Sequence, residues 1–124
     1  MYAATGFNTI FYQPLNKDIN VLNWDKIFKQ LHDNKINTLI LQWTKHNETN
    51  FYTAYPQWFE NFFKKAQEHN IDIVVGLYAD TSYFKRISSD DLESFLLYLV
   101  DENINTAESL YPFLQKQSNF VGWY

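Results

Sequence analysis

A short apolar run followed at once by polar and aromatic residues constrains this chain more than any other feature. The segment Ile36–Thr44 reads INTLILQWT, so three consecutive aliphatic residues precede Gln42, Trp43 and Thr44. A run that is apolar on both faces is typical of a parallel strand covered by helices. Polar residues at its carboxyl end lie where parallel α/β folds place their ligand sites. The segment therefore predicts a buried strand with a candidate site at its end.

Three other segments repeat this order of apolar and then polar or aromatic residues. They are Gly6–Pro14 (GFNTIFYQP), Ile71–Asp80 (IDIVVGLYAD) and Asn119–Tyr124 (NFVGWY). Helical patterns lie between the four segments, so the predicted order is β-α-β-α-β-α-β. Such alternation indicates a parallel sheet with right-handed crossovers.

The three intervening helices carry recognisable start signals. Asn23 is a good N-cap for a helix over 24–34, and Pro56 fits the first position of a helix that runs to about His69. A third helix begins at the acidic segment 88–91 and continues to about residue 117, with Pro112 predicting a kink or break. Its expected inward stripe consists of Leu92, Phe95, Leu96, Leu99 and Val100.

Two α/β architectures fit this pattern: the first half of an eight-stranded (β/α) barrel, or a small open parallel sheet. Successive side chains of a strand point to opposite faces of the sheet, so alternate residues face the same side. If Gln42 points toward the barrel axis, the same alternation gives every strand an inward-facing hydrogen-bonding group near its carboxyl end. An open sheet covered on both faces gives no reason for this coincidence, whereas a barrel mouth does. The residues expected to face the barrel axis are Thr9, Phe11, Gln13, Thr38, Ile40, Gln42, Thr44, Gly76, Tyr78, Asp80, Phe120, Gly122 and Tyr124.

Composition bounds the classes of protein that remain. With 124 residues, 46% hydrophobic and 19% charged, the chain is one globular unit, expected to be a single partial domain over 1–124. The net charge of −4 without a basic block argues against nucleic acid and anionic membranes as partners. No apolar stretch approaches the roughly 20 residues of a membrane span. The start of the chain lacks a secretory signal, although one could have been trimmed from a precursor.

The motifs FYQP, NTLILQWT, GLYAD and GWY together resemble a bacterial family of glycoside-hydrolase-like TIM barrels known mainly as a domain of unknown function. The resemblance covers nearly the whole chain but only the first half of the family's barrel. It implies a carbohydrate-active site at the carboxyl face and an exported or periplasmic protein. It also implies that the acid/base glutamate and its partner carboxylate lie beyond Tyr124, so no catalytic residue can be carried over.

Several residues of the chain itself are candidates for contacts with a sugar. Asp80 is the best carboxylate, although a turn or cap aspartate is the alternative reading. Gln13 and Gln42 can bind sugar hydroxyls, because amides both donate and accept, or they can bond across the strands instead. Tyr78 and Tyr124 can stack on sugar rings. Trp43 and Trp123, by contrast, are expected beneath the helices.

Thr44 and His46 complete the candidate set. Thr44 shares the inward parity, and His46 follows the second strand, where it could shuttle a proton, contact a substrate or simply be solvated. Three scattered histidines and no cysteine make no metal cluster. We therefore expect no metal and no cofactor.

Three functions remain open at this point. The chain can be the N-terminal half of a glycoside hydrolase that is inactive alone, or a sugar-binding or scaffold barrel without catalysis. It can also be an open half-barrel that associates with a copy of itself or with a missing C-terminal half-barrel, because an unclosed parallel sheet exposes strand edges and apolar groups. The expected partner is in each case a carbohydrate, a second copy or the other half-barrel.

Overall fold

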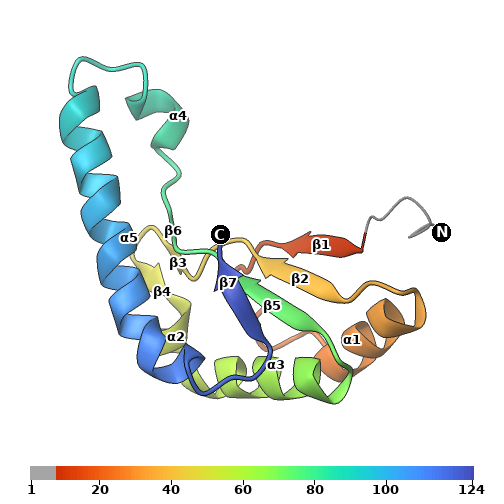
Figure 1. Cartoon of the computed structure of the whole chain (residues 1–124). Coiled ribbons are helices and arrows are strands. Elements are labelled where there is room, and N and C mark those ends of the chain that lie inside the picture. Colours follow the sequence, from red (N-terminus) through yellow and green to blue (C-terminus); the bar gives the residue numbers. More distant parts are fainter. Residues whose placement is uncertain (1–7) are drawn as a thin grey trace.

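The computed structural model describes residues 8–124 (Figure 1), so Gly6 and Phe7 of the first predicted strand lie outside the described residues. Four parallel strands form the main sheet, in the order β1-β2-β5-β7. This order confirms the predicted α/β class and places consecutive strands side by side, as in the first half of a barrel. The strands are β1 (Thr9–Tyr12), β2 (Thr38–Leu41), β5 (Asp72–Val75) and β7 (Phe120–Trp123).

Three long helices connect these strands, and two of them, with the C-terminal end of the third, cover one face of the sheet (Figure 1). They are α1 (Trp24–Asp33), α3 (Pro56–Glu68) and α5 (Leu92–Leu114). The start signals act as predicted: the side chain of Asn23 accepts a hydrogen bond from the backbone N–H of Lys26 at 3.1 Å, and Pro56 is the first residue of α3. Helix α5 continues through Pro112 and ends two residues later, at Leu114.

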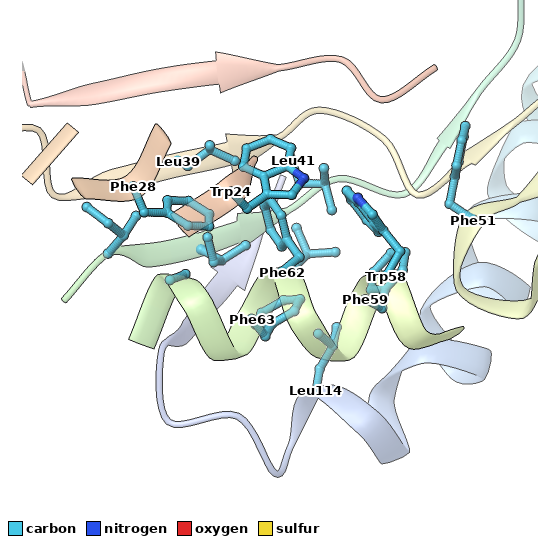
Figure 2. Close-up of a cluster of buried hydrophobic side chains, with 14 of the residues drawn as sticks. Trp24, Phe28, Leu39, Leu41, Phe51, Trp58, Phe59, Phe62, Phe63 and Leu114 are labelled. Atoms are coloured by element: carbon cyan, nitrogen blue, oxygen red, sulfur yellow. The ribbon is translucent and has the colours of Figure 1, made fainter. Parts of the chain in front are cut away.

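Aromatic rings fill the space between the sheet and the helices. Trp24 packs edge-on against Phe62 with ring centroids 4.8 Å apart, and Phe62 stacks on Trp58 at 4.9 Å. Figure 2 shows these rings against Leu41 of β2 and the inner side of α3. Because such rings bury large apolar areas, they account for much of the drive to fold in a chain of this size. The fully buried members from the strands are Leu39, Leu41, Ile73 and Val75.

Among residues 8–124, no helix covers the opposite face of the sheet (Figure 1). Phe11 of β1 is 53% exposed, while its neighbours Ile10 and Tyr12 pack toward the helices. The ring of Phe11 nevertheless contacts that of Tyr124, which follows β7 at the other edge, with centroids 5.6 Å apart. In a flat sheet three strand spacings would separate these residues by about 14 Å. The sheet is therefore curved, and its uncovered face is the concave one.

In the fourth strand, β7, one residue faces the opposite side of the sheet from the side predicted. Phe120 pairs with Ile73 and packs against the helix-side core, so the expectation that Phe120 faces the barrel axis is wrong. A bulge between Ile73 and Val74 of β5 skips one residue of β7, and Gly122 then pairs with Val74. The inserted residue reverses the alternation. Tyr124 returns to the concave face as predicted.

A second, smaller sheet lies beyond the carboxyl ends of β2 and β5, where the sequence predicts only loops. Its strands are β3 (Lys45–His46), β4 (Thr49–Asn50) and β6 (Tyr78–Ala79), in the order β4-β3-β6. Two short helices, α2 (Phe51–Ala54) and α4 (Tyr83–Arg86), follow β4 and β6. Two-residue strands carry too little pattern to be predicted.

The first half of α5 and α4 together form an arm, residues 81–103, that projects past the carboxyl ends of the strands (Figure 1). The predicted inward stripe of this helix is therefore largely wrong: Leu92, Leu96 and Val100 are exposed, and only Phe95 is buried. Phe95 packs under α4, with the guanidinium of Arg86 4.2 Å from its ring centre. The apolar pattern predicts a helix correctly, but the sheet does not extend far enough to cover it.

Gly76 allows β5 to pass from the main sheet to the small one. Its N–H donates to the carbonyl of Leu41 at 2.6 Å, and a Cβ at this position would lie 2.0 Å from the carbonyl oxygen of Gln42. Glycine is required here because the backbones of β2 and β5 meet too closely for any side chain.

We expect Gly76→Ala to destabilise the chain by about 3 kcal/mol, because the added methyl group must displace backbone rather than a flexible side chain. Urea unfolding followed by tryptophan fluorescence measures this difference. An unchanged unfolding midpoint would contradict the close approach of the two strands.

Candidate functional site

Two glutamines at neighbouring strand ends form the first part of the candidate site. Gln13 follows β1 and Gln42 follows β2, whose ladder extends this far because the N–H of Gln42 donates to the carbonyl of Tyr12 at 2.9 Å. The Nε2 of Gln13 donates to the Oε1 of Gln42 at 3.0 Å. Among the described residues, the remaining amide atoms of this pair make no hydrogen bond. The pair thus offers one acceptor and one donor at the carboxyl edge of the sheet.

Tyr124 lies on the same concave face as the glutamines. Its N–H donates to the carbonyl of Val75 at 2.8 Å, which extends the β7 ladder by one residue, and its ring meets Phe11. Phe11 precedes Gln13 by two positions and therefore shares its face of β1. The concave face consequently carries an exposed aromatic pair next to the amide pair.

Tyr78 and Asp80 form a second cluster, on β6 and at the foot of the arm. The hydroxyl of Tyr78 donates to Asp80 at 2.9 Å and lies 2.9 Å from the hydroxyl of Tyr98 on α5. Asp80 also accepts a hydrogen bond from the N–H of Ser82 at 2.7 Å and another from its hydroxyl. The carboxylate is thus engaged through both oxygens, as a turn aspartate is.

The electrostatics of this cluster follow from its hydrogen bonds. Burial, followed by the hydrogen bonds to Tyr98 and Asp80, raises the pKa of the Tyr78 hydroxyl well above its ordinary value. Burial also raises the pKa of Asp80, but the hydrogen bonds from Ser82 and Tyr78 outweigh it and leave that pKa below its ordinary value. Asp80 is consequently a charged acceptor near neutral pH and lacks the raised pKa of a general acid.

Lys45 adds a charged partner that the sequence analysis does not identify. Its ammonium forms an ion pair with Glu102 of α5 at 2.8 Å and lies 5.7 Å from the ring centre of Tyr78. Both charged side chains are partly buried. The two residues are 57 positions apart, so no local spacing signals the contact. This ion pair holds the arm against the small sheet.

Thr44 and His46 occupy different environments from the glutamines. The hydroxyl of Thr44 is fully buried and donates to the carbonyl of Gly76 at 2.8 Å, so it supports the strand crossing and does not face a ligand. His46 stacks on Trp43 at 4.8 Å, and the indole N–H of Trp43 donates to the carbonyl of Pro14 at 2.9 Å. Trp43 is half-buried at the mouth.

The structure therefore divides the predicted site into two groups. Gln13, Gln42 and Tyr124 share the concave face, whereas Tyr78 and Asp80 turn toward α5 because the chain leaves the main sheet at Gly76. No hydrogen bond between residues 8–124 joins the two groups. Within the same described part, no group of three His, Asp or Glu side chains could hold a metal ion, and no helix could span a membrane.

We expect Asp80→Asn to lower the free energy of unfolding by about 1 kcal/mol at pH 7, because a charged acceptor of three hydrogen bonds becomes neutral. The lowered pKa means that this stabilisation is complete above about pH 4, the unfolded value, and disappears as the pH falls through the folded value. The free energies of unfolding of the two proteins should thus converge as the pH falls through the folded pKa of Asp80 in chemical unfolding. The exposed Asp101→Asn is the control, and a pH-independent difference for Asp80→Asn would contradict this electrostatic role.

The comparisons with known proteins agree with this fold. The chain belongs to the family described as "Domain of unknown function (DUF4434)", which matches residues 7–124. The Escherichia coli K12 protein described as "Uncharacterized protein YbcH" is 32% identical over 105 residues, which make up 79% of this chain and 34% of YbcH. The chain thus spans about a third of the length of this curated relative. The resemblance is confirmed at the level of the family, while the individual motifs stay a prediction.

A solved structure shows the same arrangement of strands and helices. A crystal structure from Bacteroides thetaiotaomicron, provisionally described as an alpha-L-fucosidase, matches with a TM-score of 0.70 at 18% identity. The match covers 94% of this chain and 39% of that protein. At this identity the likeness concerns the fold alone. It is consistent with the half-barrel architecture derived from the curvature and order of the four strands.

Proposed function

We propose that this chain is part of a carbohydrate-active, glycoside-hydrolase-like barrel and that a sugar binds at the Gln13–Gln42 edge of its concave face. The observation that carries the proposal is the amide pair itself, which presents one free donor and one free acceptor beside an exposed aromatic pair. Sugars offer both kinds of hydroxyl hydrogen bond together with apolar ring faces. The likeness of fold to a protein provisionally described as a fucosidase gives the substrate class further support.

The second cluster, Tyr78 and Asp80, argues against acid catalysis by this chain. Glycoside hydrolysis requires two carboxyl groups placed on either side of the scissile bond, one of them commonly with a raised pKa. Asp80 has a lowered pKa, and both of its oxygens are engaged by Ser82 and Tyr78. We therefore propose that the 124-residue chain contributes sugar binding without turnover, as a non-catalytic sugar-binding barrel also would.

We expect the 124-residue chain to bind neutral monosaccharides weakly and Gln42→Ala to weaken binding about fivefold, which corresponds to the loss of one net hydrogen bond. Saturation-transfer NMR with L-fucose, D-galactose and D-glucose measures this. Gln115→Ala, on an exposed glutamine after the end of α5, is the matched control and should leave binding unchanged. Equal binding by Gln42→Ala and the unaltered chain would remove the amide pair from the site.

We also expect no hydrolysis of p-nitrophenyl α-L-fucoside or of the corresponding galactoside and glucoside by the purified 124-residue chain. The physical reason is that Asp80, the candidate carboxyl group, has both oxygens engaged and a lowered pKa. Release of p-nitrophenol above the rate of a heat-denatured sample would contradict the proposal that the chain binds without catalysis.

A further inference from the structure

We propose that Trp43 is a positioning residue for the Gln13–Gln42 amide pair. Its indole N–H replaces a hydrogen bond of the β1–β2 ladder that the backbone does not make, and His46, stacked on the indole, holds the ring in place. This inference rests on the sugar site proposed above and identifies the contacts that set the geometry of that site.

The backbone ladder between β1 and β2 ends beside the amide pair. Its last bond within residues 8–124 joins the N–H of Gln42 to the carbonyl of Tyr12 at 2.9 Å. The same spacing, continued by two residues, would join the N–H of Thr44 to the carbonyl of Pro14. The N–H of Thr44 donates instead to the carbonyl of Leu77 at 2.8 Å. Pro14 has no N–H of its own to continue the ladder.

The indole of Trp43 supplies the missing donor. Its Nε1–H donates to the carbonyl of Pro14 at 2.9 Å, although the two residues are 29 positions apart. Pro14 is buried, and a buried carbonyl without a hydrogen bond is costly. Trp43 directly follows Gln42, and Pro14 directly follows Gln13. The indole–carbonyl bond therefore fixes the separation of the two strand ends that carry the amide side chains.

His46 connects this bond to the small sheet. Its ring stacks on the indole of Trp43 with centroids 4.8 Å apart and 25° between the planes. His46 itself lies on β3, where it pairs with Ala79 of β6. The N–H of an indole lies in the plane of the ring, so a stack that fixes this plane also directs the N–H toward Pro14. The small sheet thus holds the strand end beside Gln13 through two aromatic rings.

The amide pair needs such support because its own hydrogen bond is weak. Gln13 is exposed, and its bond to Gln42 joins two neutral amides. One bond of this kind does not offset the rotamer freedom that two glutamine side chains lose when they are held together. Loss of the indole donor should therefore separate the pair and weaken sugar binding, although the indole N–H is already occupied by Pro14 and is not a sugar contact.

The experiment first follows the side-chain amides in ¹H–¹⁵N spectra. Trp43→Phe keeps an aromatic ring but removes the donor. Trp58→Phe is the matched control, because it removes an indole N–H that has no hydrogen-bond partner in the described part of the chain. In the unaltered protein the amide resonances of Gln13 and Gln42 should differ from those of the exposed Gln115. Trp43→Phe should move them toward the Gln115 position, and Trp58→Phe should leave them in place.

Sugar affinity provides the second readout, with whichever of L-fucose, D-galactose and D-glucose the unaltered chain binds most tightly. Trp43→Phe should weaken binding about threefold, less than the loss of a contacting amide. In a chain that already carries Gln42→Ala, the same change should have no further effect, because Trp43 acts through the pair. An equal loss on both backgrounds would overturn the proposal, as would unchanged amide resonances in Trp43→Phe.

Far-UV circular dichroism establishes that each variant is folded. If Trp43→Phe is unfolded, His46→Ala decides the result, because it removes the stack and keeps the donor. It should shift the indole N–H resonance of Trp43 together with the amide resonances of the pair, and unchanged resonances would overturn the proposal. If the unaltered chain binds none of the three sugars, the proposed function fails, and the amide resonances alone decide the role of Trp43.

Discussion

The fold depends on a difference between the two faces of one curved sheet. On the convex face, the side chains of Leu39, Leu41, Ile73 and Val75 alternate with inward residues and are fully buried by the aromatic layer of α1 and α3. Because curvature spreads side chains apart on this face, bulky rings such as Phe62 fit between strand and helix. On the concave face the same curvature gathers side chains, and it brings the rings of Phe11 and Tyr124 into contact. Core packing and the geometry of the open face therefore have a common origin.

The candidate site inherits this geometry. Side chains that stay on the main sheet, such as Gln13, Gln42 and Tyr124, converge on the concave face, since parallel strands end at one edge. Side chains beyond Gly76 belong to the small sheet and are held by the arm through Tyr98. The predicted site is divided into two groups because the chain leaves the main sheet after β5, at the close contact between the backbone of Gly76 and that of Gln42.

Sequence patterns predict the four main strands, the three long helices and, for three strands, which residues face the helices. These features are predictable because the spacing of buried apolar residues repeats over many consecutive positions. They fail where a single residue changes the geometry: the extra residue Val121 in β7 shifts the alternation so that Phe120 lies on the helix side, and the break at Gly76 redirects Tyr78. They also fail where an apolar pattern predicts a helix correctly but no other element packs against its apolar side, as at Leu96 on the arm, which is exposed. Contacts between distant residues, such as Lys45 with Glu102, leave no local signal.

The central claim is that these four strands curve as half of a barrel within one chain. The most direct test is the nuclear Overhauser effect between the ring protons of Phe11 and Tyr124. Filtering for pairs within the same isotopically labelled molecule excludes contacts between copies. Centroids 5.6 Å apart in an edge-to-face arrangement predict a clear cross-peak. In a flat sheet three strand spacings would place the two edge strands about 14 Å apart, and rings standing upright on one face would give no cross-peak. That absence would contradict the curvature on which the candidate site rests.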